Sequence, residues 1–574
     1  MNNKQLADLL ENIAHLLEIK GEVIYKVLAY RKAAESLREL GQEVETIYQD
    51  GSLKEIPGVG EAISEKIKEI LETGDLKYYQ TLTAEVPPTL IDLLEVPGLG
   101  PKRVALFWRE LGVTTLEELK TAAQAEQLQS LEGIGPKTET NVLRGLESLQ
   151  HRTDRTLLGD AFPLAQRLLS FLREQPGVED AQTGGSVRRM RETVGDLDIL
   201  ASAGDSQKVI EAFVKYPEVA EIVSRGEIKA SVVFSSGIRA QLWVHPPEHF
   251  GTALQYATGA KDHNVRLRKE AQEQGYSLSE HALVRESDQE ELHFSREEEV
   301  YQTLGLPWIP PELREDRGEI QAAREGRLPD LINREDILCE LHSHTTWSDG
   351  KFSIREMAEA GVERGYQILA VTDHSRSLGI AGGLSSAELE KQLEELQAVR
   401  EEMGDRIHLL SGIELEILAD GSLDFPDQIL AGLDLVIASL HTSMRQPREK
   451  VTRRLLNAIQ NPHVDIIAHP TNRLIGKREP ADLDMDAVLQ AAAEHGTALE
   501  INSNPRRLDL SDVYARRAVE MGIPLTINTD AHSPLEMDYI FYGVAAARRA
   551  WVEAGDVINC WEKDRLLSWL KNRG

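Results

Sequence analysis

The chain has 574 residues, 41% hydrophobic and 28% charged, which is typical of a soluble globular protein with several domains. No apolar stretch is long enough to cross a bilayer, the N-terminus lacks a signal-peptide layout, and two cysteines cannot form a disulfide framework. We therefore expect a cytoplasmic protein without a membrane partner. The net charge of -31 disfavours tight sequence-independent binding to nucleic acid, so any DNA site must use local basic clusters and backbone donors.

Three similar glycine turns recur in the N-terminal third. Each has an apolar residue, a Gly-x-Gly turn and then a predicted helix, which is the helix-hairpin-helix pattern. Such turns let the backbone approach a phosphate, and the helix N-terminus offers unpaired N–H donors. The pattern predicts a grip on the DNA backbone, although a plain connection between helices is the alternative. The glycines are Gly58 and Gly60, Gly98 and Gly100, and Gly133 and Gly135.

A phosphate-binding motif occupies residues 184–200. A Gly-Ser turn at Gly185 and Ser186, followed by arginines, is suited to a triphosphate. The strand that follows Gly195 points Asp196 and Asp198 to one face, where two carboxylates can hold a pair of Mg2+ ions for nucleotidyl transfer. The alternative is an acidic surface strand with the same letters.

The last 240 residues contain short apolar runs that alternate with amphipathic stretches, which predicts buried parallel strands. Metal-type side chains stand at the ends of these runs, where such folds form their active sites. The pattern predicts a multinuclear site and hydrolytic chemistry, and the mixed donors suit Zn2+ or Mn2+ better than Mg2+. The nine side chains are His342, His344, Asp349, His374, Glu414, His441, His469, Asp530 and His532.

Basic side chains are concentrated in the loops around this predicted site. Their placement suggests a groove for a polyanion such as DNA. They are Arg445, Arg448, Lys450, Arg453, Arg454, Arg473, Lys477, Arg478, Arg506 and Arg507.

Together, the hairpins, the 184–200 motif and the nine side chains resemble the bacterial X-family DNA polymerases with a C-terminal PHP (polymerase and histidinol phosphatase) domain. The resemblance implies helical N-terminal lyase-like and helix-hairpin-helix domains, an α+β nucleotidyltransferase palm, and a C-terminal α/β distorted seven-stranded PHP barrel. The implied domains are a lyase-like domain with the first hairpin (1–80), a helix-hairpin-helix DNA-binding domain (81–150), the palm (151–245), a thumb-like nucleotide-selection domain (246–315), a linker (316–334) and the PHP phosphoesterase domain (335–574).

In the palm, the resemblance assigns Ser186 and Arg189 to the incoming phosphates and Asp196 and Asp198 to Mg2+ or Mn2+. The family's third carboxylate falls on Gln241, and an amide is a poor Mg2+ ligand and cannot act as a base. Because loss of a base costs about 10²–10⁴ in rate, we expect DNA synthesis to be weak. The family's nucleotide gate and base-pair positions fall on Tyr256, Asn264 and Arg268, although the gate departs from the family at Ala257 and Ala260.

In the lyase-like domain, the lysine that forms a Schiff base with an abasic sugar falls on Lys66, and phosphate-pocket positions fall on Lys26 and Tyr30. Another basic family position is Ala62. An amine nucleophile needs a lowered pKa, and acidic residues outnumber basic ones in this domain. A solvated helix lysine is the alternative interpretation of Lys66.

In the PHP domain, the resemblance distributes the ligands over up to three metals, usually manganese or zinc. One metal takes His342, His344, Glu414 and Asp530. A second shares Glu414 with His441 and His469. The third takes Asp349, His374 and His532.

The resemblance implies a monomeric DNA-repair enzyme that binds gapped DNA, with dNTP as a possible second ligand. Its PHP domain would hydrolyse phosphodiesters as a 3'-5' exonuclease, an abasic-site endonuclease or both. Three alternatives stay open: an active gap-filling polymerase with an accessory nuclease, a DNA-binding module that tethers a PHP phosphoesterase, and a small-molecule phosphatase.

Overall fold

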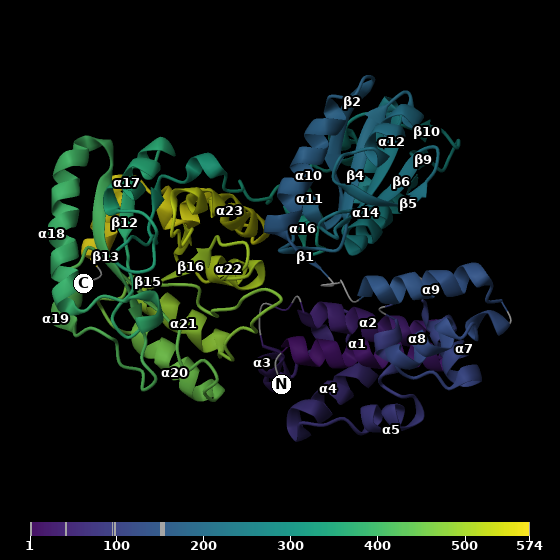
Figure 1. Ribbon diagram of the computed structural model, residues 1–574, viewed down its shortest axis with the longest axis horizontal. Coiled ribbons are helices and arrows are strands. Elements are labelled where there is room, and N and C mark those ends of the chain that lie inside the picture. Colours follow the sequence, from purple (N-terminus) through teal and green to yellow (C-terminus); the bar gives the residue numbers. More distant parts are fainter. Residues whose placement is uncertain are drawn as a thin grey trace. The chain divides into compact units, whose positions relative to one another are not determined.

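The computed structural model describes residues 3–38, 40, 43–94, 96, 99–131, 133–149 and 155–572. The chain divides into two compact units, Met1–Thr153 and Asp154–Gly574 (Figure 1). Within the described residues, no helix combines the length and the hydropathy needed to span a membrane.

The N-terminal unit is helical in its described part (Figure 1). Its core forms because apolar residues recur on one face of each helix, as with the fully buried Leu6, Leu10 and Ile13 of the first helix. The helices are α1 (Asn3–Lys20), α2 (Ile24–Arg38), α3 (Val44–Gln49), α4 (Glu61–Thr73), α5 (Lys77–Glu85), α6 (Leu90–Leu93), α7 (Pro101–Leu111), α8 (Leu116–Gln124) and α9 (Pro136–Leu149).

The glycine turns precede helices, as the sequence predicts. Gly60 and Gly100 are the N-cap residues of α4 and α7, and Gly135 directly precedes α9. Gly58 and Gly133 both have φ of +81°, a conformation that favours glycine. At Gly58 a Cβ atom would also lie 2.6 Å from Cγ of Lys32, so a side chain there would clash. Gly98 lies outside the described residues.

The palm region of the second unit is built on a five-stranded sheet in the order β2-β4-β7-β6-β5. β4 and β7 are parallel, and the other neighbours are antiparallel. Helices α10 (Leu158–Arg173) and α12 (Ser206–Val214) contribute apolar side chains to the core of this sheet. The strands are β2 (Val178–Thr183), β4 (Leu197–Ala203), β5 (Val219–Arg225), β6 (Lys229–Phe234) and β7 (Arg239–His245), and the short helix α11 (Gly185–Arg188) follows β2.

A smaller thumb region follows, with its own apolar core. It contains α13 (Phe250–Thr258), α14 (Lys261–Glu273), α15 (Glu297–Thr303) and a sheet of β8 (Tyr276–Leu278), β9 (Leu283–Arg285) and β10 (Glu291–Leu292). The predicted linker contains helix α16 (Glu319–Arg324), whose Ile320 and Ala323 are buried in the thumb core, so this segment is a packed part of the fold.

The C-terminal domain is the predicted barrel of seven strands. All neighbouring strands are parallel and follow chain order, and a parallel bridge between Ser343 and Ala531 links the two ends, so the barrel is nearly closed. The strands are β11 (Cys339–Glu340), β12 (Ile368–Val371), β13 (His408–Glu416), β14 (Leu435–Ser439), β15 (Ile466–Ile467), β16 (Ala498–Asn502) and β17 (Leu525–Asn528).

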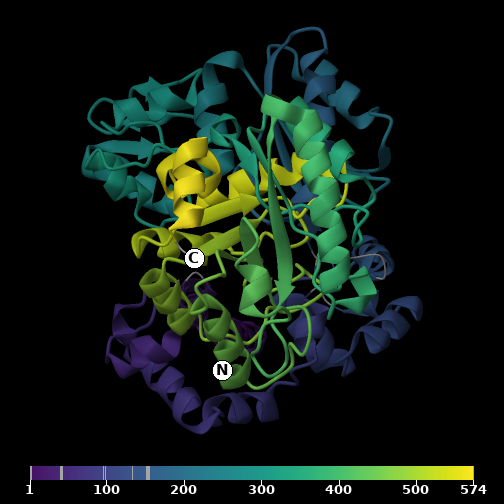
Figure 2. The same ribbon diagram turned by 90° about the vertical axis from the view of Figure 1, so that its left-hand side faces the viewer.

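Helices surround these strands, and α18 (Ser386–Met403) runs beside the long strand β13 (Figure 2). Successive residues of a strand face opposite sides, so Ile368 and Ala370 lie in an inner apolar cluster while Leu369 and Val371 pack in the outer one. The other helices are α17 (Ile354–Glu363), α19 (Asp427–Leu430), α20 (Arg448–Ile459), α21 (Met485–His495), α22 (Asp512–Glu520), α23 (Ile540–Arg549) and α24 (Lys563–Lys571).

Candidate functional site

All nine predicted metal-type side chains gather at the carboxyl ends of the barrel strands. His342 and His344 follow β11, His374 follows β12, and Glu414 lies near the end of β13. The remaining strands position the others in the same way, and only Asp349 comes from a longer loop. Because parallel strands place their carboxyl ends at one edge, residues far apart in the sequence become neighbours here.

Glu414 is the centre of this cluster. Its Oε2 lies 3.4 Å from Nε2 of His342 and 3.5 Å from Nε2 of His344. Its Oε1 lies 3.4 Å from Nε2 of His441 and 3.1 Å from Nε2 of His469. The two oxygens of one carboxylate thus face different groups of imidazoles, which is the arrangement that a shared ligand requires.

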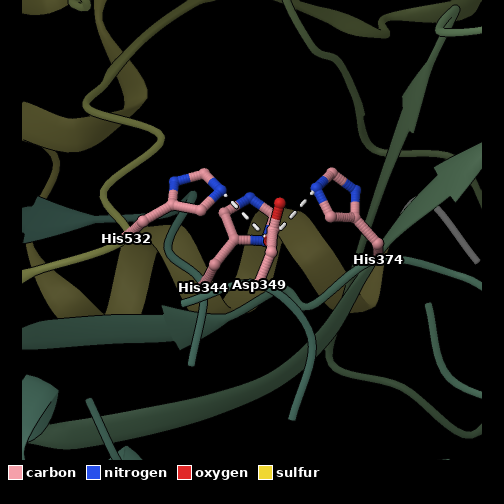
Figure 3. A group of neighbouring side chains, drawn as sticks. All are labelled: His344, Asp349, His374 and His532. Atoms are coloured by element: carbon pink, nitrogen blue, oxygen red, sulfur yellow. Dashed lines mark ion pairs between the residues drawn. The ribbon is translucent and has the colours of Figure 1, made fainter. Parts of the chain in front are cut away.

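A second group surrounds Asp349, toward which His532 and His374 point from opposite sides (Figure 3). Oδ1 of Asp349 lies 3.2 Å from Nε2 of His532 and 3.6 Å from Nε2 of His374. His344 belongs to both groups, since its Nδ1 lies 3.9 Å from Asp349 and its Nε2 lies 3.0 Å from Oδ1 of Asp530. His374 also reaches Glu414, with Nδ1 2.8 Å from Oε2. The two imidazoles therefore connect ligand sets that the sequence reasoning kept apart.

Buried atoms without partners show that this donor set fits metal ions. Nε2 of His342, both ring nitrogens of His344 and Oε2 of Glu414 have no hydrogen-bond partner within the described part of the chain. Leaving such a buried polar atom unsatisfied costs about 1–3 kcal/mol, whereas a divalent cation would satisfy several of them at once.

Two further carboxylates orient the histidines. Nδ1 of His342 lies 2.8 Å from Oε1 of Glu500, and Nδ1 of His441 lies 3.1 Å from Oε2 of Glu416. Such contacts fix the ring orientation of a metal ligand. The sequence reasoning missed both glutamates. The available signals were weak: Glu416 is two residues from Glu414 on one strand, and Glu500 interrupts an apolar run.

Burial and neighbouring charges shift the pKa values of the cluster in different directions. Burial, with the positive fields of His374 and His532, lowers the pKa of His344 to about 3, so its ring is neutral and can act as a ligand. Burial opposes ionisation of Glu414, but the fields of His374 and His441 hold the pKa of this carboxyl well below its usual range. Burial disfavours protonation of His342, His374 and His532, but the nearby carboxylates raise the pKa of these rings, that of His532 to about 9, so a cation that binds here would displace protons from them.

The palm carboxylates lie together, and an amide takes the third place. Asp198 pairs with Gln241 across the parallel strands β4 and β7. Nε2 of Gln241 donates a hydrogen bond to Oδ2 of Asp196 at 2.8 Å. Burial and the charge of Asp196 raise the pKa of Asp198 to about 7. Gly185 has φ of +53°, and a Cβ there would lie 2.1 Å from Oδ2 of Asp198, so the Gly-Ser turn closes directly over this carboxylate.

The predicted nucleotide-binding residues are held by internal contacts. Nε of Arg189 donates to Oε1 of Glu315 at 3.0 Å, and its Nη1 donates to the carbonyl oxygen of Thr258. The amide of Asn264 donates to the carbonyl of Tyr256 at 2.7 Å, and Nε of Arg268 donates to the carbonyl of Asn264 at 3.3 Å. Ser186 lies in α11, and Gly195 precedes Asp196 just before β4. Internal hydrogen bonds thus fix Arg189, Asn264 and Arg268 in place.

The lyase-like residues converge on Tyr78, which the sequence reasoning missed. Nζ of Lys66 lies 4.8 Å from the centre of the Tyr78 ring and Nζ of Lys26 lies 5.7 Å from it, while Tyr30 stacks on the same ring at 6.3 Å. Lys66 also donates to the carbonyl of Ala62 at 3.0 Å. Burial and the charge of Lys26 lower the pKa of Lys66. The amine thus has the neighbouring cation that composition alone did not reveal.

The arginines near the metal centre divide into two kinds. Arg454 is buried and Arg473 is partly buried, and both donate to backbone carbonyls, so they stabilise the fold. Arg478 and Arg507 instead share Oδ1 of Asn472, at 2.5 and 2.6 Å. Nε of Arg507 lies 3.9 Å from Oδ2 of Asp530, which places its guanidinium at the edge of the metal cluster.

Comparison with known proteins identifies the family. Models of a helix-hairpin-helix domain, a SAM-like helix-hairpin-helix tandem, the DNA polymerase beta thumb and the PHP domain match residues 1–76, 90–148, 253–315 and 340–504. The "DNA polymerase/3'-5' exonuclease PolX" of Bacillus subtilis (strain 168) is 39% identical over 573 residues, covering 100% of both chains. The chain belongs to the X-family DNA polymerases with a PHP domain.

Two further relatives match parts of this X-family chain. DNA polymerase lambda of Rattus norvegicus is 28% identical over 345 residues, 54% of this chain and 56% of its own. A probable phosphatase of Caldanaerobacter subterraneus is 35% identical over 207 residues, 34% of this chain and 76% of its own. The chain is therefore an enzyme with nucleotidyltransferase architecture and a PHP domain, and its hairpin and thumb domains indicate DNA as its partner.

Proposed function

We propose that this X-family enzyme acts in DNA repair, as a monomer, by hydrolysing phosphodiesters of gapped or 3'-ended DNA at the PHP centre. The activity is 3'-5' exonuclease, abasic-site endonuclease or both, and DNA synthesis by the palm is weak. One contrast supports this proposal. The nine PHP side chains form a dense and largely buried cluster with unsatisfied ligand atoms, whereas the palm has Gln241 in place of a carboxylate.

The PHP residues would hold up to three ions, Mn2+ or Zn2+. His342, His344, Glu414 and Asp530 would hold one, Glu414 with His441 and His469 a second, and Asp349 with His374 and His532 the third. Bound cations of this kind polarise a phosphate and lower the pKa of water. The chain itself orients the imidazoles through Glu416 and Glu500, and the guanidinium of Arg507 beside Asp530 would bind a phosphate oxygen.

The other domains would hold the DNA. The glycine turns at Gly58, Gly60, Gly100, Gly133 and Gly135 present helix N-termini that suit backbone phosphates. The lowered pKa of Lys66 supports a role as the amine that forms an imine with an abasic sugar, with Lys26 and Tyr30 in the phosphate pocket.

The palm would bind dNTP with Mg2+ or Mn2+ but transfer it slowly. Asp196 and Asp198 retain the metal-type pair, and Gly185, Ser186, Arg189 and Gly195 form the phosphate turn. Gln241 presents an N–H donor to Asp196, where a metal ligand and proton acceptor would be needed. The retained aspartates are the observation that favours the second candidate, an active gap-filling polymerase.

Hydrolysis can be tested on a primer labelled at its 5' end, annealed in gapped DNA and incubated with Mn2+ but without dNTP. We expect stepwise shortening of the primer by the wild type. Glu414→Gln should abolish it, because this residue is shared between two ligand groups. Asp196→Ala should shorten the primer at the wild-type rate. Shortening that survives in Glu414→Gln but is lost in Asp196→Ala would contradict the proposal.

A further inference from the structure

One loop of the PHP domain, residues 503–511 between β16 and α22, contacts both the metal centre and the palm. Arg507 points to the metal centre, with its guanidinium beside Asp530 and hydrogen-bonded to Asn472. The next residue, Leu508, is 3% exposed and belongs to the apolar core of the palm. Two consecutive residues thus contact two different domains. A displacement of the palm core at Leu508 would therefore displace Arg507.

Arg473 connects this loop to the palm by charge. Its Nε donates to the carbonyl of Arg507 at 2.9 Å, and its Nη2 donates to the carbonyl of Leu508. The same Nη2 donates to Oε2 of Glu192 at 2.6 Å. Glu192 lies in the palm, directly after the arginines of the phosphate turn. A palm carboxylate therefore fixes the guanidinium that holds the backbone of Arg507.

Two residues near these contacts have a positive φ, a backbone conformation that residues other than glycine adopt less often. Asn472 has φ of +47° and Leu508 has φ of +42°. Such conformations persist only where the surroundings enforce them. Arg473 follows Asn472 in the chain and binds the carbonyl of Leu508, so it joins the two segments that contain these residues.

We propose that Glu192 of the palm is a positioning residue for hydrolysis at the PHP centre. Through Arg473 it holds Arg507 where a phosphate oxygen would bind, so the PHP centre depends on the palm for its geometry. This inference rests on the proposed hydrolytic function. It assigns a role in hydrolysis to a palm residue that is not one of the metal-type side chains.

The chain offers a closely matched control. Glu218 is also a palm glutamate paired with an arginine, Arg167, at 3.1 Å, and within the described residues its carboxylate forms no hydrogen bond or ion pair with the PHP domain. The side chains of Glu192 and Glu218 are 39% and 37% exposed. Glu192→Ala and Glu218→Ala therefore remove the same group from similar surroundings, and Glu192→Gln keeps a hydrogen-bond acceptor without the charge.

The test uses the full chain with Mn2+ and bis(p-nitrophenyl) phosphate. This small phosphodiester is not DNA, so binding of DNA by the palm does not affect the measured rate. We expect Glu192→Ala to raise KM roughly fivefold or more, with a smaller change in kcat. Glu192→Gln should fall between it and the wild type, and Glu218→Ala should match the wild type. Arg507→Ala should raise KM similarly, and Glu192→Ala should add little in the Arg507→Ala background.

A second readout does not depend on activity or metal. The amides of Arg507 and Leu508 donate to the carbonyl of Asn504 at 2.7 and 3.0 Å. Hydrogen exchange at these amides should be faster in Glu192→Ala than in Glu218→Ala. Unchanged KM together with unchanged exchange would overturn the inference. A wild type that hydrolyses no diester would instead refute the proposed function, and exchange alone would then decide the positioning role.

Discussion

Gln241 and Glu414 show how single residues set the chemistry of the two centres. Glu414 lies among imidazoles whose fields keep it ionised, and its two oxygens face separate groups of rings. Gln241 occupies the matching position of a carboxylate in the palm, yet it donates a hydrogen bond to Asp196. The first residue is suited to bridging cations, and the second replaces a ligand by a donor.

Restoring the carboxylate should therefore restore DNA synthesis. We expect Gln241→Asp to raise the rate of single-nucleotide addition by about 10²-fold, because it supplies both a ligand and a base. Primer extension on gapped DNA with Mg2+ measures this rate. Gln241→Asn is the matched control, since it has the same size without the charge. Equal rates in both variants would show that Gln241 is not the limiting residue.

The pKa of Lys66 should depend on Lys26. Burial and the positive charge of Lys26 lower this pKa, so removing that charge in Lys26→Met raises it and reduces the neutral amine at neutral pH. Borohydride trapping of the enzyme on abasic DNA should become slower at pH 7 and approach the wild-type rate at high pH. Lys68→Met removes a lysine from α4, the helix that contains Lys66, and should not change the pH profile of trapping. A profile that is unchanged by Lys26→Met would contradict this account.

At the scale of elements, the strand ends and the glycine turns carry the functional positions. The sequence predicts where most of the ligands lie because all but Asp349 stand at the end of an apolar run, and parallel strands bring such positions to one edge. It does not predict that His344 and His374 link two ligand groups, or that Glu500 orients His342, since these contacts join strands distant in the chain. The short strands β11 and β15 also carry little periodicity of their own.

The first glycine turn gives a stability prediction. Gly58 has φ of +81° and no room for a Cβ beside Lys32, whereas Gly60 has an extended backbone and open space. Gly58→Ala should therefore destabilise the N-terminal unit by about 1–3 kcal/mol, and Gly60→Ala should change its stability little. Denaturant unfolding of the full chain, followed by hydrogen exchange in α2 and α4, measures both. Similar losses in the two variants would contradict the steric argument.

At the scale of the whole molecule, the chain has a charge of -31 but a partner that is itself a polyanion. We expect backbone N–H donors at the glycine turns and cations such as Lys26, Arg478 and Arg507 to attract phosphate locally. This local attraction would offset the repulsion between DNA and the net negative charge of the chain. The palm and the PHP barrel belong to one compact unit, and Glu192 and Leu508 show contacts that a domain-by-domain interpretation of the sequence did not predict.

Metal ions should stabilise only this second unit. The unsatisfied donors of the PHP cluster would be paired by bound ions, and an ion at a hundred times its Kd stabilises the folded state by about 2.7 kcal/mol. Calorimetry after chelation should therefore show a lower Tm for residues 154–574 and no change for the N-terminal unit. His344→Ala should remove most of the difference. A Tm that does not respond to Mn2+ or Zn2+ would contradict the assignment of the cluster.

The most direct test of the central claim places hydrolysis and synthesis in one reaction. DNA with a one-nucleotide gap and a labelled primer is incubated with Mn2+ and dNTP, using the wild type, Asp196→Ala and His344→Ala. We expect the wild type to shorten the primer with little extension. The Asp196→Ala variant should shorten it to the same degree, and the His344→Ala variant should not shorten it. Efficient extension that Asp196→Ala abolishes would contradict the account and establish a gap-filling polymerase.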